Sequence, residues 1–368
     1  MNLQAVRIGC CITPHGLGHA ARACAVLEAL SARLPVHFEI VSTAPNWFFQ
    51  QSLTAPFILH ALPTDVGLVQ HDSLREDIDL TLTRLDAFYP LRPELVRQTA
   101  SLLAKCRLIL CDIAPLGIAA AELARRDFGS TVQSVLIENF TWDWIYQGYA
   151  RKKPVLNSYI DYLRELFNRA DIHIQAEPIC APSKADFRIL PAARSVRQGR
   201  RTIREQIGLP ESSKVILVTM GGIAGAALPL KRLAAMERDC SFLLAGQPVD
   251  KLTVQGNLHL LPQANNLWHP DLIAACDAVV GKIGYSTLAE VFQAGVPYGA
   301  VCRPRFRESE VLAAFAKQKM PCLLFSEEQF ENGSWLDMLP ELLALPPKKG
   351  QRQTGAAAAA EFLSGILL

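Results

Sequence analysis

Short apolar runs alternate with amphipathic stretches along the whole chain. Apolar runs of roughly four to eight residues bounded by turn-forming residues are typical of strands buried on both faces, whereas apolar positions that recur every three to four residues are typical of helices covering a sheet. This alternation predicts parallel sheets with helices on both faces. In the first half, the expected strands are Val6–Ile12, Val36–Val41, Phe57–Leu62, Leu108–Ile113, Val132–Ile137 and Ile172–Ala176.

The same rhythm restarts in the second half. A stretch rich in Pro and Arg, from Pro182 to about Pro210, separates the halves. We interpret it as a solvated linker leading into a short helix that ends near Gly208, with phosphate binding by its arginines as the alternative. The expected strands beyond it are Val215–Thr219, Phe242–Ala245, Leu258–Leu261, Ala278–Val280, Tyr298–Cys302 and Cys322–Phe325.

The length agrees with two domains, because 368 residues are too many for one ordinary core. We therefore expect the α/β class, with two tandem doubly wound (Rossmann-like) domains and an interdomain cleft. The expected boundaries are 1–190 for the N-terminal domain and 191–350 for the C-terminal domain. Residues 351–368 are expected to form a C-terminal helix that packs back on the N-terminal domain.

Composition narrows the class of partner. Lys plus Arg number 37 and Asp plus Glu 35, a net charge of +2, so no global field favours nucleic acid. The ten cysteines are scattered without a CxxC pair and predict buried thiols rather than disulfides or a zinc site. The sequence starts directly in a strand without a signal-peptide pattern, which predicts a cytoplasmic protein. No apolar run is long enough to span a bilayer, although peripheral membrane contact by the alanine-rich tail stays open.

The segment Asp277–Pro297 has the layout of an anion site. A buried strand leads into a turn with Gly281 and Gly284, and an amphipathic helix follows. The unpaired N–H groups and the dipole at the start of such a helix suit a diphosphate. Glu290 lies about one turn further in, where a carboxylate can accept both ribose hydroxyls. The alternative is a plain strand, turn and helix with Ser286 as the N-cap.

Each half also opens with a glycine-rich turn after its first strand, where ligands of open α/β sheets bind. The first turn carries Gly16 and Gly18, and the second carries Gly221 and Gly222. Neither turn matches the dinucleotide fingerprint or a Walker loop, so NAD and ATP are poorly supported. Two domains that present such turns to a cleft suit a diphosphate ligand together with a second substrate.

These motifs carry a resemblance. The arrangement G-Y-S-T-L-A-E-x4-G-V-P (284–297), preceded by M-G-G-I-A-G (220–225), looks like the nucleotide-sugar half of GT-B glycosyltransferases. The resemblance implies an N-terminal domain on the acceptor side and a C-terminal domain that binds the nucleotide sugar. It implies ribose binding by Glu290 and diphosphate binding by the turn at Gly284–Thr287. It also places donor-sugar contacts after the strand ending at Cys302.

A second similarity is to the N-terminal, glycosyltransferase-like region of plant L-arabinokinases. It rests on H-G-L-G-H-A-A-R (15–22), D-V-G-L-V-Q-H-D (65–72), N-F-T-W-D-W-I-Y (139–146) and G-K-I-G-Y-S-T (281–287). The sugar kinase domain of those proteins would begin where this sequence stops, and no kinase phosphate loop is present. We therefore do not expect arabinokinase activity.

Three residues are candidates for the base that removes the acceptor proton. His19 begins the first helix beside a glycine turn, where its ring can act as the base or donate to a phosphate. Asp112 ends a strand. Asp143 lies in an aromatic segment whose Trp142, Trp144 and Tyr146 form either a sugar-stacking platform or a packed helix face. A capping or buried histidine, an N-cap and a loop hydrogen bond are the structural alternatives. The expected nucleotide-sugar contacts are Gly16, Gly18, Gly221, Gly222, Gly284, Tyr285, Ser286, Thr287, Glu290, Arg303, Glu308 and Glu310.

The hypothesis is therefore a glycosyltransferase that uses a nucleotide-diphosphate sugar, with UDP favoured, and an unknown acceptor. A nucleotide-sugar 2-epimerase and a non-catalytic nucleotide-sugar-binding protein remain as alternatives. We expect no cofactor and no metal. The only D-x-D, Asp77 and Asp79, lies in a helical pattern where alternate residues point apart, so a solvated face is the better interpretation.

Overall fold

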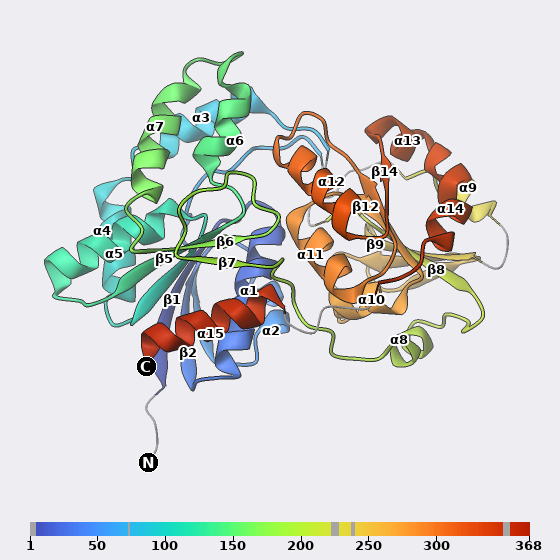
Figure 1. Ribbon diagram of the computed structural model, residues 1–368, viewed down its shortest axis with the longest axis horizontal. Helices are drawn as coiled ribbons and strands as arrows, with labels where there is room; N and C mark the ends of the chain where they lie inside the picture. Colours follow the sequence, from blue (N-terminus) through green and yellow to red (C-terminus); the bar gives the residue numbers. More distant parts are fainter. Residues whose placement is uncertain (1–4, 73, 222–227, 237–239, 349–353) are drawn as a thin grey trace. The chain divides into compact units, whose positions relative to one another are not determined.

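The computed structural model describes residues 5–72, 74–221, 228–236, 240–348 and 354–368. The chain divides into two compact units (Figure 1). Unit 1 comprises Met1–Val69, Glu76–Ala193 and Gln353–Leu368, and unit 2 comprises Gln70–Arg75 and Arg194–Arg352. Each unit has its own sheet.

Unit 1 contains a sheet of seven parallel strands in the order β3-β2-β1-β4-β5-β6-β7. Its strands are β1 (Val6–Ile12), β2 (Val36–Val41), β3 (Phe57–His60), β4 (Leu108–Asp112), β5 (Gln133–Glu138), β6 (Ile172–Ala176) and β7 (Phe187–Ile189). Its helices are α1 (Gly18–Ser31), α2 (Asn46–Ser52), α3 (Ile78–Phe88), α4 (Pro93–Leu103), α5 (Pro115–Phe128), α6 (Trp142–Ala150), α7 (Leu156–Phe167) and α15 (Gly355–Leu367).

Unit 2 repeats this arrangement, with the strand order β10-β11-β9-β8-β12-β13-β14. Its strands are β8 (Lys214–Thr219), β9 (Cys240–Gln247), β10 (Thr253–Gln255), β11 (Leu258–Pro262), β12 (Ala278–Lys282), β13 (Tyr298–Val301) and β14 (Cys322–Phe325). Its helices are α8 (Arg200–Gln206), α9 (Leu230–Ala234), α10 (His269–Ala275), α11 (Tyr285–Ala294), α12 (Glu308–Lys319), α13 (Glu327–Asn332), the 3-10 helix η1 (Ser334–Met338) and α14 (Leu339–Ala344).

Both sheets have the doubly wound order. When only the parallel strands of each unit are numbered in chain order, both sheets contain the order 3-2-1-4-5-6. This order confirms the predicted fold class. The sequence pattern missed two edge strands. β7 and β10 have three residues each, too few for an apolar run to stand out, and β10 is antiparallel to its neighbour β11.

The core of unit 2 shows why its strands are almost wholly apolar. Alternate residues of β8 enter two different core clusters: Val215 and Leu217 pack with α8, α10, α11 and α12, whereas Ile216 and Val218 pack with α9, α13, η1 and α14. Because successive side chains point to opposite faces, a strand covered on both faces must be apolar at every position. Leu74, from the short insertion Gln70–Arg75, is buried in the second cluster.

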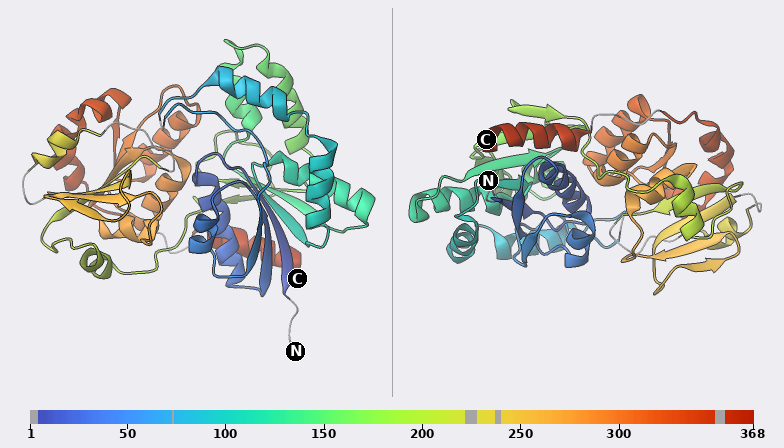
Figure 2. Two further views of the ribbon diagram at one scale, coloured as in Figure 1. Left: turned by 180° about the vertical axis from the view of Figure 1, so that it is seen from behind. Right: turned by 90° about the horizontal axis from the view of Figure 1, so that it is seen from below.

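The C-terminal helix α15 belongs to unit 1, where it packs beside α1 and the edge strand β7 (Figure 2). Phe362 stacks on Phe187 with ring centroids 4.6 Å apart. Glu361 pairs with Arg33, which lies two residues after the end of α1. The start of α15 is capped by Thr354, whose hydroxyl accepts from the Ala357 N–H.

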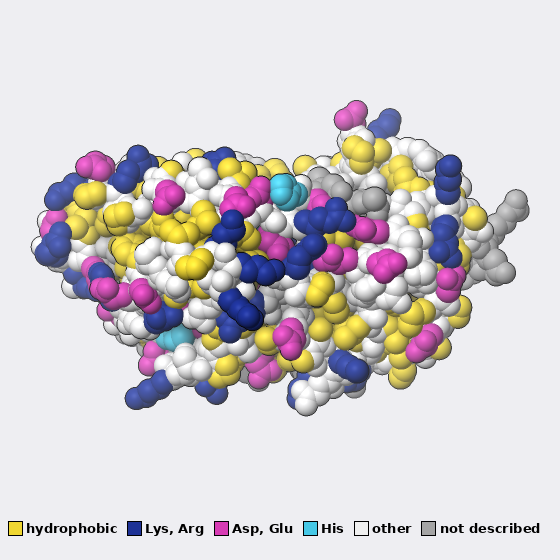
Figure 3. Space-filling model, turned by 90° about the horizontal axis from the view of Figure 1, so that it is seen from above, with side chains coloured by type: hydrophobic (Ala, Val, Ile, Leu, Met, Phe, Trp, Pro, Cys, Tyr) yellow, Lys and Arg dark blue, Asp and Glu magenta, His cyan; other side chains and the backbone are white. Residues whose placement is uncertain are grey.

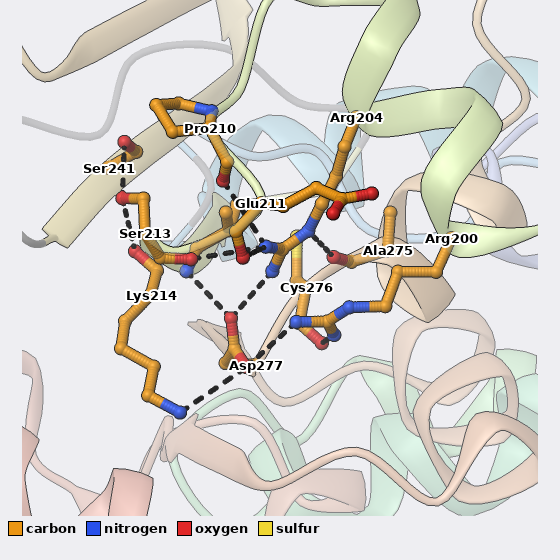
Figure 4. Close-up of polar contacts among 11 residues, drawn as sticks. Arg200, Arg204, Pro210, Glu211, Ser213, Lys214, Ser241, Ala275, Cys276 and Asp277 are labelled. Atoms are coloured by element: carbon orange, nitrogen blue, oxygen red, sulfur yellow. Dashed lines mark hydrogen bonds and ion pairs between the residues drawn. The ribbon is translucent and has the colours of Figure 1, made fainter.

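The expectation of a solvated linker is wrong for two of its arginines. Arg204 of α8 is buried, donates to the carbonyl oxygens of Ala275 and Ser213 at 3.0 and 3.1 Å, and pairs with the Asp277 carboxylate at 2.7 Å (Figure 4). Arg194 is buried against Glu290. A dense run of basic residues in a sequence usually indicates a solvated surface. Here these two guanidinium groups instead donate hydrogen bonds to buried carbonyl and carboxylate oxygens.

On the face in Figure 3, basic and acidic side chains are interspersed, in agreement with the small net charge. Among the described residues, no helix is both long enough and apolar enough to cross a membrane.

Candidate functional site

The strand order of unit 1 reverses between β1 and β4, and ligands of doubly wound sheets bind at this reversal. Ile12, the last residue of β1, pairs with Asp112, the last residue of β4. The chain leaves β1 through Gly16, whose φ of +67° suits glycine, and α1 begins at Gly18. His19 in the first turn of α1 is thereby brought to the Asp112 carboxylate.

His19 and Asp112 form a hydrogen-bonded dyad. His19 Nδ1 lies 2.9 Å from Asp112 Oδ1, and both side chains are buried. Because an ionised carboxylate only accepts, the proton of the imidazole is on Nδ1 and donates to Asp112. The Nε2 atom then carries a lone pair, and it makes no hydrogen bond to a residue that the structure describes.

Arg22, one turn further along α1, completes the network. Its Nε donates to Asp112 Oδ2 at 2.8 Å, and its Nη2 donates to Asp112 Oδ1 at 2.6 Å. Its Nη1 donates to Asn139 Oδ1 at 2.6 Å. The sequence reasoning missed Arg22, although it ends the quoted segment H-G-L-G-H-A-A-R. The spacing of His19 and Arg22, three residues apart on one helix face, was the available signal.

The carboxylate of Asp112 stays ionised despite complete burial. Burial opposes the charged form, but the Arg22 guanidinium and the hydrogen bond from His19 outweigh it and lower the pKa of Asp112. Ile113, which follows, has a φ of 41°, unusual for a β-branched residue. Asp112 is not the N-cap of α5, because Ala114 has that position.

The aromatic segment after β5 is packed, so a sugar-stacking platform is wrong for Trp142 and Tyr146. Both are fully buried: Trp142 Nε1 donates to Asp65 Oδ2 at 2.8 Å, and the Tyr146 hydroxyl donates to the Gly67 carbonyl at 2.7 Å. Asp65 also accepts from Thr13. Burial raises the pKa of Asp65 to about 7, although both hydrogen bonds oppose this shift.

Asp143 does not join the dyad. It is in the first turn of α6, where its carboxylate lies 3.7 Å from Arg164 Nε of α7. Burial raises the pKa of Asp143, with a hydrogen bond from Thr141 and the Arg164 charge acting against it. Its side chain lines a separate cavity in unit 1. The structure therefore unites His19 and Asp112 and leaves Asp143 apart.

Unit 2 has the equivalent reversal between β8 and β12. Gly281 of β12 pairs with Thr219 at the end of β8, and a Cβ on Gly281 would lie 1.9 Å from the Thr219 carbonyl oxygen. The chain leaves β8 through Gly221, whose φ is +78°. Lys282 ends β12, and its Nζ would lie only 3.6 Å from a Cβ on Gly221.

Lys282 is a functional candidate that the sequence reasoning missed. Burial lowers its pKa to about 7, the Arg303 guanidinium adds to this shift, and Glu308 opposes it. Arg303 and Glu308 are both buried, and the guanidinium carbon of Arg303 lies 4.1 Å from the Phe306 ring centroid. Their charges act on Lys282 at the end of β12, whereas their expected contact with a donor sugar stays a prediction. Glu310 is exposed. Two cations facing one carboxylate leave this region with a surplus of positive charge.

Helix α11 starts beside Lys282. Its N-cap is Gly284, without a side-chain hydrogen bond, so the alternative of Ser286 as the N-cap is wrong. Tyr285, Ser286 and Thr287 form the first turn, where backbone N–H groups have no partner within the helix. Gly295 closes the helix with a φ of 72°, as its position after the last apolar residue indicates.

Glu290 is buried in α11 and already has two partners. Arg194 Nε donates to Glu290 Oε1 at 2.8 Å, and His269 Nδ1 lies 2.7 Å from Glu290 Oε2. Burial opposes ionisation, but the Arg194 charge and the hydrogen bond from His269 outweigh it and lower the pKa of Glu290. The carboxylate is thus ionised and held in one orientation.

The loop before α10 contributes a second arginine stack. The guanidinium carbons of Arg194 and Arg197 lie 4.5 and 3.7 Å from the Trp268 ring centroid, and Trp268 Nε1 donates to the Ser195 carbonyl. Trp268 itself is buried.

Other expected residues are placed as follows. Gly222 lies outside the described residues. Within the described part of the chain, no group of three or more His, Cys, Asp or Glu side chains is arranged to hold a metal ion. Asp77 caps α3 by accepting from the Leu80 N–H, and the exposed Asp79 pairs with Lys153, so the D-x-D does not form a paired carboxylate.

Known proteins share this architecture. No protein-family model matches the chain. A UDP-glucosyltransferase from Polygonum tinctorium superimposes with a TM-score of 0.60, at 14% identity, over 100% of this chain and 99% of that one. The chain has the GT-B glycosyltransferase fold. At this level of identity the likeness concerns the fold.

Two curated proteins are similar in sequence. The L-arabinokinase of Arabidopsis thaliana is 26% identical over 351 residues, which cover 91% of this chain and 32% of the kinase. The UDP-N-acetylglucosamine--N-acetylmuramyl-(pentapeptide) pyrophosphoryl-undecaprenol N-acetylglucosamine transferase of Bacillus licheniformis is 27% identical over 206 residues, 51% of this chain and 54% of the transferase. The chain thus spans about a third to a half of the length of these relatives, and the similarity to a GT-B glycosyltransferase-like protein is confirmed.

Proposed function

We propose that this chain transfers a sugar from a nucleotide-diphosphate sugar, with UDP the favoured nucleotide, to an acceptor. The observation that carries the proposal is the sheet reversal of unit 2, where Lys282 ends β12 beside Gly221 and the uncapped start of α11. A cation, a glycine turn and a helix N-terminus together suit a diphosphate.

Catalysis requires stabilisation of the departing diphosphate, whose negative charge grows as the glycosidic bond breaks. In this proposal the Lys282 ammonium and the N–H groups of the first turn of α11 meet that charge. Arg303 supplies a second positive charge in the same region. Arg303 is buried, and a buried cation is more effective than an exposed one, since less water screens it.

Glu290 would hold the ribose. Its Oε1 and Oε2 atoms each have one partner in unit 2, but an ionised carboxylate has about four acceptor positions. The remaining lone pairs can accept from two hydroxyl groups of the ribose. Arg194 and His269 would fix the carboxylate in place for that contact.

His19 would act as the base. Its Nδ1 proton is committed to Asp112, so the Nε2 lone pair can take the acceptor's proton. The Asp112 carboxylate then stabilises the imidazolium that forms. In this proposal, residues of unit 1 take up the acceptor's proton and residues of unit 2 stabilise the departing diphosphate.

The test is product analysis of the purified chain with UDP-sugars, with and without a panel of monosaccharide, phenolic and lipid-linked acceptors. The proposal expects UDP release and a glycosylated product only when an acceptor is present. A changed sugar without acceptor would instead show an isomerase. Tight UDP-sugar binding without turnover on any acceptor would show a binding module, and absence of UDP-sugar binding would overturn the proposal for unit 2.

A further inference from the structure

Asp65 is a buried carboxylate near the dyad that the proposed mechanism does not use. It lies between β3 and α3 and is only 6% exposed. Its Oδ1 accepts from the Thr13 hydroxyl and its Oδ2 accepts from Trp142 Nε1, both at 2.8 Å. No Lys, Arg or His in the described part of the chain forms an ion pair with it. Burial of a carboxylate without a cation is costly, so a position that keeps one is a candidate for a functional role.

The two donors connect Asp65 to the surroundings of His19. Thr13 follows β1 in the turn that leads to α1, and its backbone N–H donates to the Asp112 carbonyl at 3.4 Å. Trp142 begins α6, and its ring centroid lies 6.1 Å from that of His19. About one indole ring therefore separates the Asp65 carboxylate from the His19 imidazole. A fixed charge at this range acts on the imidazole, because little water screens it in a buried site.

The charges of the network explain why a second carboxylate is useful there. Asp112 and Arg22 together are neutral, since the guanidinium donates two hydrogen bonds to the ionised carboxylate. A proton taken up by His19 would therefore leave these three groups with a net positive charge in a buried site. With Asp65 ionised, the same step takes the whole group from one negative charge to none. One carboxylate thus balances the Arg22 guanidinium and the other balances the imidazolium.

The charge of Asp65 itself depends on pH near neutrality. The other titratable or charged side chains around it are His15 after β1, His19 and Arg22 of α1, Asp112 of β4, Tyr89 after α3 and Tyr146 of α6. Burial raises the pKa of both tyrosine hydroxyls well above the usual value, so they stay neutral near pH 7. Burial also raises the pKa of Asp65 to about 7, against its two hydrogen bonds, and the Asp112 charge adds to the rise.

We propose that Asp65 is a positioning residue of the transfer reaction, whose negative charge balances the proton that His19 takes from the acceptor. This role rests on the proposed function, in which His19 is the base. The proton moves from the acceptor hydroxyl to His19 Nε2, the acceptor oxygen bonds to the sugar, and the diphosphate leaves with the electron pair. Asp65 exchanges no proton in this step. It acts through the field of its carboxylate and through the Trp142 indole that it holds beside His19.

The experiment compares turnover of the wild type and Asp65→Asn between pH 6 and pH 8.5. The donor is saturating UDP-glucose and the acceptor is phenol, which is neutral over this range, or the pair from the panel above that gives product. The wild type should be faster by about twofold or less at pH 6 and by about tenfold at pH 8.5, where Asp65 is ionised. One unit charge acting across roughly 10 Å contributes about tenfold at an effective dielectric constant of about 20. The ratio of the two rates at each pH cancels the pH dependence expected from Lys282.

A purely structural role would give a different result. An asparagine at this position can still accept from Trp142 and can donate to the Thr13 hydroxyl. Between about pH 4 and pH 7 the folded chain keeps a proton on Asp65 that the unfolded chain loses, so this carboxylate lowers stability as the pH rises. Asp65→Asn should therefore melt at the same temperature as the wild type or higher at pH 8.5. A lower melting temperature, with a rate loss that is the same at pH 6 and pH 8.5, would overturn the proposal.

Thr13→Val is the second variant, for the case that Asp65→Asn does not fold. It removes a hydrogen bond that favours the ionised carboxylate, so the ¹³Cγ resonance of Asp65 in ¹³C-aspartate-labelled protein should titrate at a higher pH than in the wild type. A resonance that does not titrate between pH 6 and pH 8.5, or that titrates equally in both proteins, would contradict the role of Asp65.

Asp171→Asn is the matched control. Asp171 also accepts from a hydroxyl, that of Ser134, but it precedes β6 and so lies at the opposite end of the strands. It should leave the pH dependence of turnover unchanged. No glycoside from any acceptor of the panel would overturn the proposed function and this role with it. Transfer with the same pH dependence in the wild type and Asp65→Asn would overturn this role alone.

Discussion

Removal of the Arg22 guanidinium should separate the structural and chemical roles of the unit 1 network. In Arg22→Met the side chain keeps its aliphatic volume but loses three hydrogen bonds of 2.6 to 2.8 Å, two to Asp112 and one to Asn139. Arg22 and Asp112 are 1% and 0% exposed. Loss of one partner from such a buried ion pair costs about 3–5 kcal/mol, equivalent to a melting-temperature decrease of about 10 °C for a domain of this size.

The chemical effect should be larger than the loss of stability explains. Without the guanidinium, burial is no longer outweighed, and the pKa of Asp112 rises. A protonated Asp112 donates to His19 Nδ1, which moves the imidazole proton to Nε2 and removes the lone pair that would act as the base. Turnover should therefore fall by about 10²-fold or more, the usual contribution of a general base. Donor KM should change little, because the proposed donor contacts belong to unit 2.

The readout that distinguishes the two roles is the tautomer of His19. Two-bond ¹H–¹⁵N NMR spectra of the ¹⁵N-histidine-labelled protein should show Nδ1 protonated in the wild type and Nε2 protonated in Arg22→Met. Arg204→Met is the matched control, since Arg204 is an equally buried arginine paired with an aspartate, but in unit 2. It should lose comparable stability with no change at His19. An unchanged His19 tautomer and unchanged turnover in Arg22→Met would limit Arg22 to a structural role.

Three further predictions concern unit 2 and the metal. Affinity for a UDP-sugar should fall roughly 30-fold between about pH 6 and pH 8.5, because Lys282, with a pKa of about 7, is charged below that pH and neutral above it. Calorimetric titration of Lys282→Arg should give an affinity that does not change over this pH range. A wild-type affinity that is equally independent of pH would show that the Lys282 ammonium does not bind the diphosphate. Glu290→Gln should weaken the same affinity at least about tenfold, and unchanged binding would exclude a ribose contact. Turnover should be unchanged in EDTA. The double variant Asp77→Ala with Asp79→Ala should keep turnover near wild type and lose about 1 kcal/mol of folding stability, because the cap of α3 is removed. Activity lost in chelator and restored by Mn²⁺ would contradict metal independence.

The sequence was sufficient for the fold because the fold depends on local patterns. The strands expected from apolar runs were observed with small shifts at their ends, such as β4 ending at Asp112 rather than Ile113. The doubly wound order then places the residues that follow β1 and β8 at the sheet reversals, so His19 and Gly221 could be found from the sequence.

The charge network could not be predicted in the same way. Arg22 and Asp112 are 90 residues apart in sequence, and a helical arginine without a visible partner resembles a surface residue. Lys282 was overlooked for a similar reason, because a lysine at a strand end usually reaches solvent. Arg204 lay in a basic run that favoured a solvated interpretation, although its partners are Ala275, which ends α10, and Asp277, two residues further on. Each case depends on tertiary contacts that periodicity does not report.

The two units have the same backbone arrangement at the sheet reversal but place residues of opposite charge there. In each, the turn after the first strand faces the last residue of the fourth strand, which is Asp112 in unit 1 and Lys282 in unit 2. In unit 1 the Arg22 guanidinium neutralises the Asp112 carboxylate. A proton that binds to His19 would then place one further positive charge beside that carboxylate. The cationic position in unit 2 has Arg303 beside it and a single carboxylate, Glu308, against it. In the proposed reaction these same two charges form, a positive charge on the base and a negative charge on the diphosphate. The proposal therefore expects both charges to be stabilised without a metal, since each would form next to a fixed group of opposite sign.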